Sequence, residues 1–257
     1  LSQSIQEEIG KKGMHLMTAA VDDQDVSEVA SYRALMEKVD GVVIAEPRSS
    51  HLVEYAHARR RPAVLASSSE EHPRVDTVDI DNEQTGFGAT HYVLSLGHRH
   101  IAYVKGPQAV PAARLRYEGF CRAMCAAGEP VDDALVVSGE GWTIEDGAHA
   151  FIDLTDRARP LTAVVCANDL LAIGVLQTAR ANGIAVPDQL SVIGCDNIDL
   201  SAHSDPPLTT MDNHIRSIGR AAVRRLMDRI QGDDGPPQRI LFPGSIVERR
   251  TCARAGC

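Results

Sequence analysis

The polar residues of this chain that could carry out chemistry do not form a complete catalytic motif. The sequence has no Gly-x-Ser-x-Gly nucleophile turn, no Gly-x4-Gly-Lys-Ser/Thr phosphate loop and no His-Glu-x-x-His zinc motif. Gly86-Phe87-Gly88 resembles the start of a dinucleotide-binding loop, but it lies inside a helical pattern, and His91 stands where the third glycine would fall. We therefore interpret these glycines as small residues that let a helix pack closely on a sheet. The sequence predicts no catalytic residue and no cofactor.

Two other polar groups have both a chemical and a structural interpretation. His98, Arg99 and His100 look like metal ligands, but they lie where a predicted helix runs into a strand. Basic residues at that place complement the carbonyl end of the helix dipole, so we predict no metal site. Asn168-Asp169 is either an acid/base pair or a helix N-cap after a strand, a position where both residue types are preferred. Capping is the favoured interpretation, and it leaves Asn168 able to face a ligand as well.

Composition limits the classes of function. The chain has 257 residues, 44% of them apolar, which is enough for one to two globular domains. Aromatic residues make up only 4%, which disfavours a surface that stacks nucleic-acid bases. The formal charge is -9, with 26 Lys and Arg against 35 Asp and Glu, so this chain itself does not look like a DNA-binding domain.

The compartment can also be inferred from the sequence. No run of about 20 apolar residues is present, so we expect no transmembrane segment, and the N-terminus lacks the pattern of a secretory signal. The six cysteines form no Cys-x-x-Cys pair, and a chain of this length needs no disulfides to fold. We therefore expect a reduced, cytoplasmic protein.

Helical and strand patterns alternate along the chain. The spacing of apolar residues predicts helices at 2–12, 25–38, 52–60, 82–96, 114–127, 144–154, 169–182 and 215–230. Apolar runs predict strands at 14–20, 41–45, 62–66, 75–80, 100–104, 135–138, 161–166 and 190–195. Such alternation indicates βαβ units with parallel sheets, and the number of strands favours two doubly wound halves, the first ending near Ile80. Because ligands bind beyond the carboxyl ends of such strands, we expect a site in a cleft between the halves.

Several segments, in order, carry a resemblance to a known family. They are Asp79-Ile80-Asp81-Asn82, Leu96-Gly97-His98-Arg99, Arg114-x-Arg116-x-x-Gly119-Phe120, Cys166-Ala167-Asn168-Asp169, Ser191-Val192-Ile193-Gly194-Cys195-Asp196 and Pro206-Pro207-Leu208-Thr209-Thr210. Together they resemble the effector-binding core of the lactose/galactose repressor (LacI/GalR) family of bacterial transcription regulators. The likeness runs from Leu1 to about Arg250.

The resemblance implies an α/β fold with two doubly wound, parallel-sheet subdomains of the periplasmic-binding-protein-like type I, joined by three crossover strands. The N-terminal subdomain would comprise 1–81 and 213–242, and the C-terminal subdomain 82–212 and 243–257. The family also implies an N-terminal helix-turn-helix DNA-binding domain that this chain does not contain. A βαβ half normally begins with a strand, whereas this chain begins with a helix, so we expect further residues before Leu1. The negative net charge of this chain is then compatible with a DNA-binding regulator, because the part that contacts DNA is not in this sequence.

Family positions that contact the effector can be carried over residue by residue. They fall on Arg116, Asp196, Asn168, Trp142, Ser67 and Asn213, the last two expected from the first half of the fold. A guanidinium offers a rigid fork of donors to sugar hydroxyls or to a carboxylate, and an indole can stack on the apolar side of a sugar. Structural roles stay open beside these: a surface arginine, a loop cap for Asp196, a helix cap for Asn168 and plain packing for Trp142.

These residues lead to one main functional hypothesis and two others. We expect the sensing domain of a LacI-type, DNA-binding transcriptional regulator, in which a small polar effector, a sugar or a sugar derivative, shifts DNA affinity allosterically. The resemblance implies a homodimer that acts on operator DNA through the missing domain. The alternative is the solute-binding protein of a sugar transporter, against which the matches at 96–99 and 206–210 and the unpaired cysteines argue. An α/β enzyme is a third class, with no motif to support it.

Overall fold

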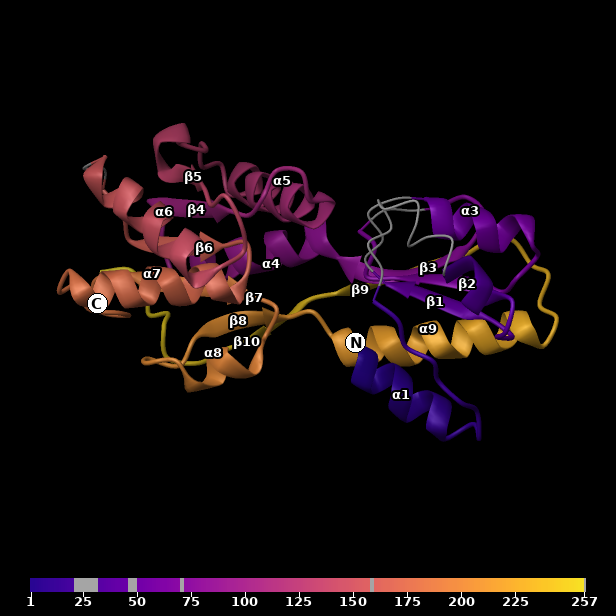
Figure 1. The fold of residues 1–257 in the computed structure, drawn as a ribbon. Coiled ribbons are helices and arrows are strands. Elements are labelled where there is room, and N and C mark those ends of the chain that lie inside the picture. The colour runs from indigo at the N-terminus through magenta and orange to yellow at the C-terminus, as the bar shows by residue number, and fades with distance from the viewer. Residues whose placement is uncertain (21–31, 46–49, 70–71, 158–159, 257) are drawn as a thin grey trace. The chain divides into compact units, whose positions relative to one another are not determined.

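The chain divides into two compact units, each built around its own sheet. The computed structural model describes residues 1–20, 32–45, 50–69, 72–157 and 160–256. Unit 1 comprises Leu1–Ile80 and His214–Phe242, and unit 2 comprises Asp81–Asn213 and Pro243–Cys257 (Figure 1). The chain therefore passes from one unit to the other three times. These dividing points lie within one residue of the predicted boundaries, and the assignment of the units as separate subdomains stays a prediction.

Unit 2 contains a mostly parallel sheet of six strands in the order β10-β8-β7-β6-β4-β5. Its strands are β4 (Ile101–Lys105), β5 (Val136–Ser138), β6 (Ala163–Cys166), β7 (Ser191–Cys195), β8 (Thr209–Asp212) and β10 (Ser245–Val247). All pairs are parallel except β10, which runs antiparallel to β8. Every residue of β6 and β7 is buried, as expected where both faces of a parallel sheet are covered.

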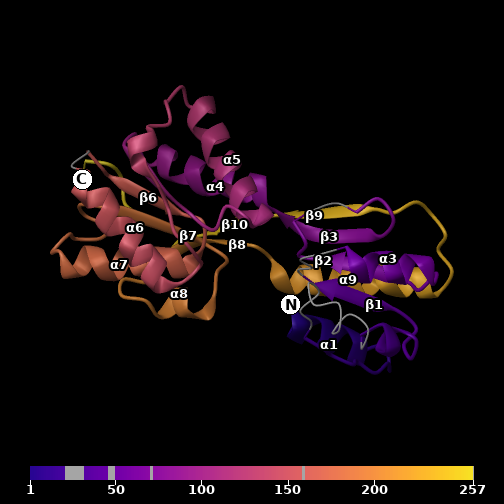
Figure 2. The same cartoon turned by 45° about the horizontal axis from the view of Figure 1, so that its top comes forward.

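The helices of unit 2 cover both faces of this sheet. They are α4 (Asn82–Ser95), α5 (Pro111–Ala126), α6 (Ile144–Asp156), α7 (Asp169–Ala181) and the short α8 (Asp199–His203), with a 3-10 turn at Asp133–Leu135. Helix α5 leads from β4 outward to β5, whereas α6 and α7 lead back along the sheet to β6 and β7. Because such crossovers are right-handed, the two directions place their helices on opposite faces. Accordingly, α4 packs with α5, and α6 packs with α7 (Figures 1 and 2).

The α4–α5 contact depends on glycines in both helices. A Cβ on Gly119 would lie 2.1 Å from the carbonyl oxygen of Glu83, and a Cβ on Gly86 would lie 2.0 Å from that of Arg116. The helices therefore touch through their backbones. The sequence predicted that these glycines pack against a sheet, and for Gly86 this is wrong, because Gly86 faces helix α5. Gly88 does face a strand, at the Met211 side chain of β8.

Unit 1 contains a sheet of four strands in the order β1-β2-β3-β9. Its elements are α1 (Ser2–Gly10), β1 (Val42–Ala45), α3 (His51–Ala58), β2 (Ala63–Ala66), β3 (Asp76–Asp81), α9 (Ile215–Ile230) and β9 (Arg239–Pro243). The last residue of β3 and that of β9 already belong to unit 2. Strand β2 alternates between two cores: Leu65 packs in the core that contains Val53 of α3, and Val64 packs with Ile218 of α9. Helix α1 packs against α9 (Figure 2).

The sequence-based fold prediction is confirmed in class and corrected near the N-terminus. The predicted strand at 14–20 is wrong: no strand is assigned there, and Leu16 and Met17 are 39% and 60% exposed. An apolar pattern reports only which side chains can be buried, whereas a strand also needs a partner edge for its backbone. Of the predicted helix at 25–38, residues 32–36 are helical, and residues 25–31 lie outside the described part of the chain.

Within the described ranges, no helix combines the length and the apolar character needed to cross a bilayer. The same residues contain no group of three or more His, Cys, Asp or Glu side chains that could hold a metal ion.

Candidate functional site

Several predicted effector residues of unit 2 follow the carboxyl ends of its strands. Asn168 follows β6, Asp196 follows β7, and Asn213 follows β8. Since β6, β7 and β8 are parallel neighbours, the residues that follow them share one edge of the sheet. This edge is where ligands bind in open α/β sheets.

Arg116 of α5 reaches this edge and is held there by three groups. Its side chain is only 7% exposed. Nε donates to Oδ1 of Asn82 at 2.9 Å, and Nη1 donates to the carbonyl oxygen of Ala167 at 2.6 Å. Nη2 lies 3.0 Å from Oδ1 of Asp196. The guanidinium plane is therefore fixed by α4, by the turn after β6 and by the turn after β7.

Asp196 is the partly open member of this cluster. Its side chain is 34% exposed, and its Oδ1 also accepts a hydrogen bond from Nδ2 of Asn213 at 2.7 Å. The backbone φ of Asp196 is 124° and that of Asn197 is 54°, both in the left-handed region. Strained conformations of this kind are concentrated at functional sites.

Arg116 and Asp196 each oppose the effect that burial has on the pKa of the other. Burial lowers the pKa of Arg116, but Asp196, Cys195 and Tyr103 together more than offset this and leave the pKa raised. Burial raises the pKa of Asp196, and the adjacent guanidinium opposes that rise. Burial also raises the pKa of the Cys195 thiol, so this group stays protonated and is no activated nucleophile. The Arg116–Asp196 pair has no net charge, which suits a neutral ligand.

Asn168 and Trp142 lie next to each other in the same unit. Oδ1 of Asn168 accepts from the backbone N–H of Leu171 at 2.8 Å, which confirms the predicted N-cap. Nδ2 of Asn168 donates to the carbonyl oxygen of Trp142 at 3.3 Å. The indole lies over the backbone of Gly106, where a Cβ would come within 2.4 Å of two ring carbons. The cap of α7 thus also supports the turn that carries the tryptophan.

Ser67 and Asn213 were both expected from the first half of the fold, and the structure separates them. Ser67 follows β2 in unit 1, has a φ of 56°, and donates its backbone N–H to the carbonyl oxygen of Val78 at 3.1 Å. Asn213 instead belongs to unit 2 and is 3% exposed. The reason is local: it directly follows β8, and its amide is bonded to Asp196.

Sequence reasoning missed two residues of this site. Asn82 accepts from Arg116 and is 1% exposed. Asp169 is fully buried, and it accepts from the backbone N–H of Ile198, two residues after Asp196. Asn82 directly follows strand β3, and Asp169 follows the short turn after strand β6. A position just after a parallel strand is the signal that could have identified both residues.

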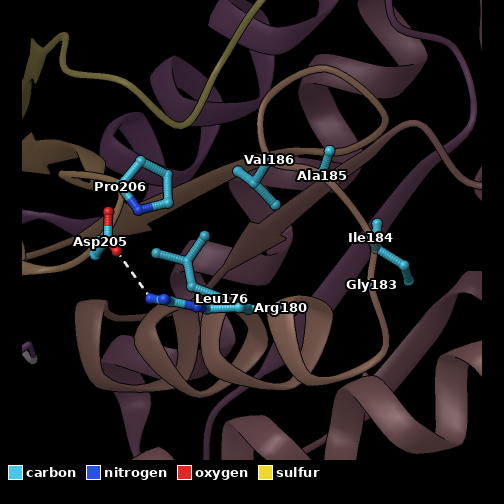
Figure 3. A pocket seen from close by; sticks show the side chains of 8 residues that line it. All are labelled: Leu176, Arg180, Gly183, Ile184, Ala185, Val186, Asp205 and Pro206. Carbon is cyan, nitrogen blue, oxygen red and sulfur yellow. Dashed lines mark hydrogen bonds and ion pairs between the residues drawn. The ribbon is translucent and has the colours of Figure 1, made fainter.

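A separate pocket of about 300 Å³ in unit 2 contains none of the predicted effector residues. It lies between the end of α7 and the turn before β8, and its lining includes Leu176, Val186 and Pro206 (Figure 3). Its charged groups, Arg180 and Asp205, form an ion pair at 2.8 Å but are 73% and 81% exposed. An exposed pair of this kind is weak and offers no fixed set of donors.

The chain is similar in sequence to known regulators of transcription. Residues 90–252 match the family described as "Periplasmic binding protein-like domain". The chain is 35% identical over 221 residues to the "HTH-type transcriptional repressor CytR" of Escherichia coli K12, a match that covers 85% of the chain and 64% of the relative. It is 32% identical over 256 residues to the "HTH-type transcriptional regulator DegA" of Bacillus subtilis 168, covering 98% and 75%. The chain thus spans a little under two thirds of the length of CytR.

Solved structures give the same result. A "transcriptional regulator CelR-cellobiose complex" superimposes with a TM-score of 0.86 at 29% identity, covering 97% of this chain and 77% of the other. A LacI family transcriptional regulator from Enterococcus faecium with bound ribose superimposes with a TM-score of 0.85 at 26% identity, covering 98% and 92%. The proteins to which the chain is similar are regulators of transcription, and two of the structures hold a sugar.

Proposed function

Because the chain belongs to the LacI/GalR family of transcription regulators, we propose that it is the effector-sensing part of such a regulator. The effector is a small neutral polyhydroxyl compound, a sugar or a sugar derivative. It binds to Arg116 and Asp196 of unit 2, and its binding changes the DNA affinity of the regulator. Effector and DNA are then coupled sites, for which the coupling free energy is typically about 1–3 kcal/mol.

One observation carries this proposal: the fixed arrangement of Arg116, Asp196 and Asn213, which has no net charge. The guanidinium of Arg116 is held by three partners. Oδ1 of Asp196 contacts both Arg116 and Asn213. A guanidinium and a carboxylate side by side offer fixed donors and an acceptor to adjacent hydroxyl groups. Because the donors are fixed before binding, little side-chain entropy is lost when a ligand arrives.

The sugars bound to related regulators support the class of effector. Cellobiose is present in the CelR complex and ribose in the Enterococcus faecium structure. Both compounds are neutral and rich in hydroxyl groups. We propose a ligand of this kind for the present chain, with Trp142 and Asn168 as further contacts and Ser67 as a contact from unit 1.

The alternative functions rank below that of a regulator. A regulator is favoured over a transporter's solute-binding protein because the relatives are repressors and regulators. We propose no enzymatic activity. Operator DNA as partner, a helix-turn-helix domain that reads it, a homodimer and a cytoplasmic location all stay proposals. Sedimentation of the purified chain tests the dimer, and a monomer at micromolar concentration would contradict it.

A thermal-shift screen tests the proposed effector class. The panel contains cellobiose, ribose, other neutral sugars, polyols and nucleosides. A ligand at about 100 times its dissociation constant stabilises the folded chain by about 2.7 kcal/mol, which is easily detected. We expect at least one neutral polyhydroxyl compound to raise the melting temperature, and a panel without any effect would contradict the proposal.

Two matched variants then locate the binding residue by calorimetry. Asp196→Asn removes the charge beside Arg116, and we expect it to weaken binding of the compound found in the screen by at least tenfold. Asp205→Asn removes an equally charged carboxylate in the other pocket, and we expect it to leave affinity unchanged. Equal affinity of Asp196→Asn and the wild type would contradict the assignment.

A further inference from the structure

The turn after β7 carries Asp196 in a conformation that needs support. Asp196 and Asn197 both have positive φ, 124° and 54°, and neither is glycine. L-residues pay free energy to adopt this region, and it persists only where surrounding contacts hold it. The contacts that hold this turn therefore also decide where the Asp196 carboxylate lies relative to Arg116.

Asp169 contacts the part of this turn that follows Asp196, which the backbone bond from Asp196 to Met211 and the side chain of Arg249 on Asn197 also hold. Its Oδ2 accepts from the backbone N–H of Ile198 at 2.9 Å. Its Oδ1 accepts from the hydroxyl of Thr210 at 2.5 Å, and the Thr210 oxygen in turn accepts from the backbone N–H of Asn197 at 3.4 Å. One carboxyl group thus holds the two residues that follow Asp196, one directly and one through a hydroxyl.

The sheet leaves room for this carboxyl group at one position. A Cβ on Gly194 of β7 would lie 2.3 Å from Oδ1 of Asp169. Any larger residue at 194 would displace the carboxyl group from Thr210. The absence of a side chain at Gly194 therefore allows the Asp169 carboxyl group to take this position, an observation that does not depend on the hydrogen bonds.

Capping does not account for Asp169. The N-cap of α7 is Asn168, whose side chain accepts from Leu171. The Asp169 side chain is fully buried and faces the β7–α8 turn. The charged and titratable groups near it include Asp196, Cys195 and Cys166, and Arg249 donates to Asn197 and Ser201 in the same region. Burial is the largest influence on the pKa of Asp169 and raises it, so we look for the use of this carboxyl group in the contacts it makes.

We propose that Asp169 is a positioning residue for effector recognition: it holds the turn 196–198 so that Asp196 stands beside Arg116. The proposal rests on the proposed function, in which Asp196 binds the effector. Asp169 touches no effector itself and acts only through the turn.

Two substitutions at this position separate positioning from bulk stability. Asp169→Asn keeps an oxygen for the Ile198 N–H, and its amide can donate to Thr210, whose hydroxyl then turns to the Met211 carbonyl oxygen 3.5 Å away. Asp169→Ala removes both contacts. If Asp169→Ala does not fold, Thr210→Val removes the hydroxyl while keeping the shape of the side chain.

The first measurement is hydrogen exchange of the peptide covering 195–199 in the chain without ligand. We expect Asp169→Ala to speed exchange there by at least tenfold relative to the wild type, with exchange in α5 unchanged, and Asp169→Asn to restore the wild-type rate. Thr210→Val is expected to speed exchange in the same peptide. Unchanged exchange in Asp169→Ala, or in Thr210→Val where the alanine variant is unfolded, would overturn the proposal. A uniform rise across the chain would also overturn it, since it would show a stabilising role alone.

The second measurement is calorimetry with cellobiose and ribose as probes. We expect Asp169→Ala, or Thr210→Val in its place, to lower the affinity for the probe that the wild type binds by at least fivefold. The affinity of Asp169→Asn is expected to stay within twofold of that of the wild type. If the wild type binds neither probe, this arm counts against the proposed function, while the exchange rates still decide whether Asp169 holds the turn. Faster exchange with unchanged affinity would overturn the role in recognition.

Discussion

Arg116 is the residue on which the account of the site depends most, and its surroundings change what a substitution there would test. The guanidinium contacts Asn82, Ala167 and Asp196 inside unit 2. Removing it with alanine would leave a carboxylate without its partner, and breaking a buried pair in this way costs about 3–5 kcal/mol. Because Asp196 is a third exposed, the lower end applies. Lysine, which keeps the charge, is the more informative replacement.

We expect Arg116→Lys to weaken effector binding by about tenfold to a hundredfold, because hydrogen bonds to charged groups contribute about 1.5–3 kcal/mol each and an ammonium group cannot reproduce the planar fork. Calorimetry with the compound found by thermal shift measures this. Arg122→Lys is the matched control, since Arg122 lies on the same helix and is 47% exposed. The assignment fails if Arg116→Lys binds like the control.

At the scale of the element, the crossing of α4 and α5 decides where Arg116 points. The two backbones meet at Gly86 and Gly119, so the helix that carries Arg116 lies directly against the helix that begins with its partner Asn82. A wider crossing would move the guanidinium away from both Asn82 and Asp196. The site is therefore sensitive to helix packing at residues that touch no ligand.

Gly119→Ala tests this dependence. Its Cβ would lie 2.1 Å from the Glu83 carbonyl oxygen and 2.6 Å from the Phe87 nitrogen, both backbone atoms that cannot move aside alone. We expect a loss of about 1–3 kcal/mol in the free energy of unfolding, measured with urea, together with weaker effector binding. Gly10→Ala is the control, because nothing lies within 4 Å of its Cβ position, and it is expected to leave the stability of the chain nearly unchanged. Equal stability of the two variants would contradict the tight crossing.

Sequence patterns predicted elements better than they predicted contacts. The helices from Asn82, Ile144, Asp169 and Ile215 begin where the spacing of apolar residues placed them. The strand predicted at 14–20 fails because pairing depends on a partner that no local pattern shows. Sequence also placed Arg116 and Asp196 in one site, but it could not show that Asn213 joins them in unit 2 or that Asp169 supports the turn. Those facts depend on the register of β7 against β8.

At the scale of the whole molecule, both units contain a buried carboxyl group beside a turn with positive φ. In unit 1, Asp79 accepts from the backbone N–H of Ser69, where Ser67 and Ser69 have φ of 56° and 60°. In unit 2, Asp169 accepts from Ile198. Burial raises the pKa of Asp79 to about 6, against the opposing effect of its backbone hydrogen bonds. Burial raises the pKa of Asp169 to about 6 as well, with Asp196 adding to the rise.

These raised pKa values predict a pH dependence of stability. The folded chain keeps a proton that the unfolded chain has already released, so the contribution of each group is full below about pH 4 and is lost as the pH rises through about 6. Asp79→Asn and Asp169→Asn remove it. We expect the free energy of unfolding of each variant, minus that of the wild type, to increase by about 1–3 kcal/mol between pH 4 and pH 7 in urea titrations. A difference that stays constant over this range would contradict the burial of these charges.

The most direct test of the central claim is a crystal structure of the chain with the neutral sugar or polyol found by thermal shift. The account predicts that hydroxyl groups of the ligand lie within about 3.2 Å of an Nη atom of Arg116 and of an oxygen of Asp196. A ligand bound only in the pocket lined by Arg180 and Asp205, with Arg116 and Asp196 untouched, would contradict it.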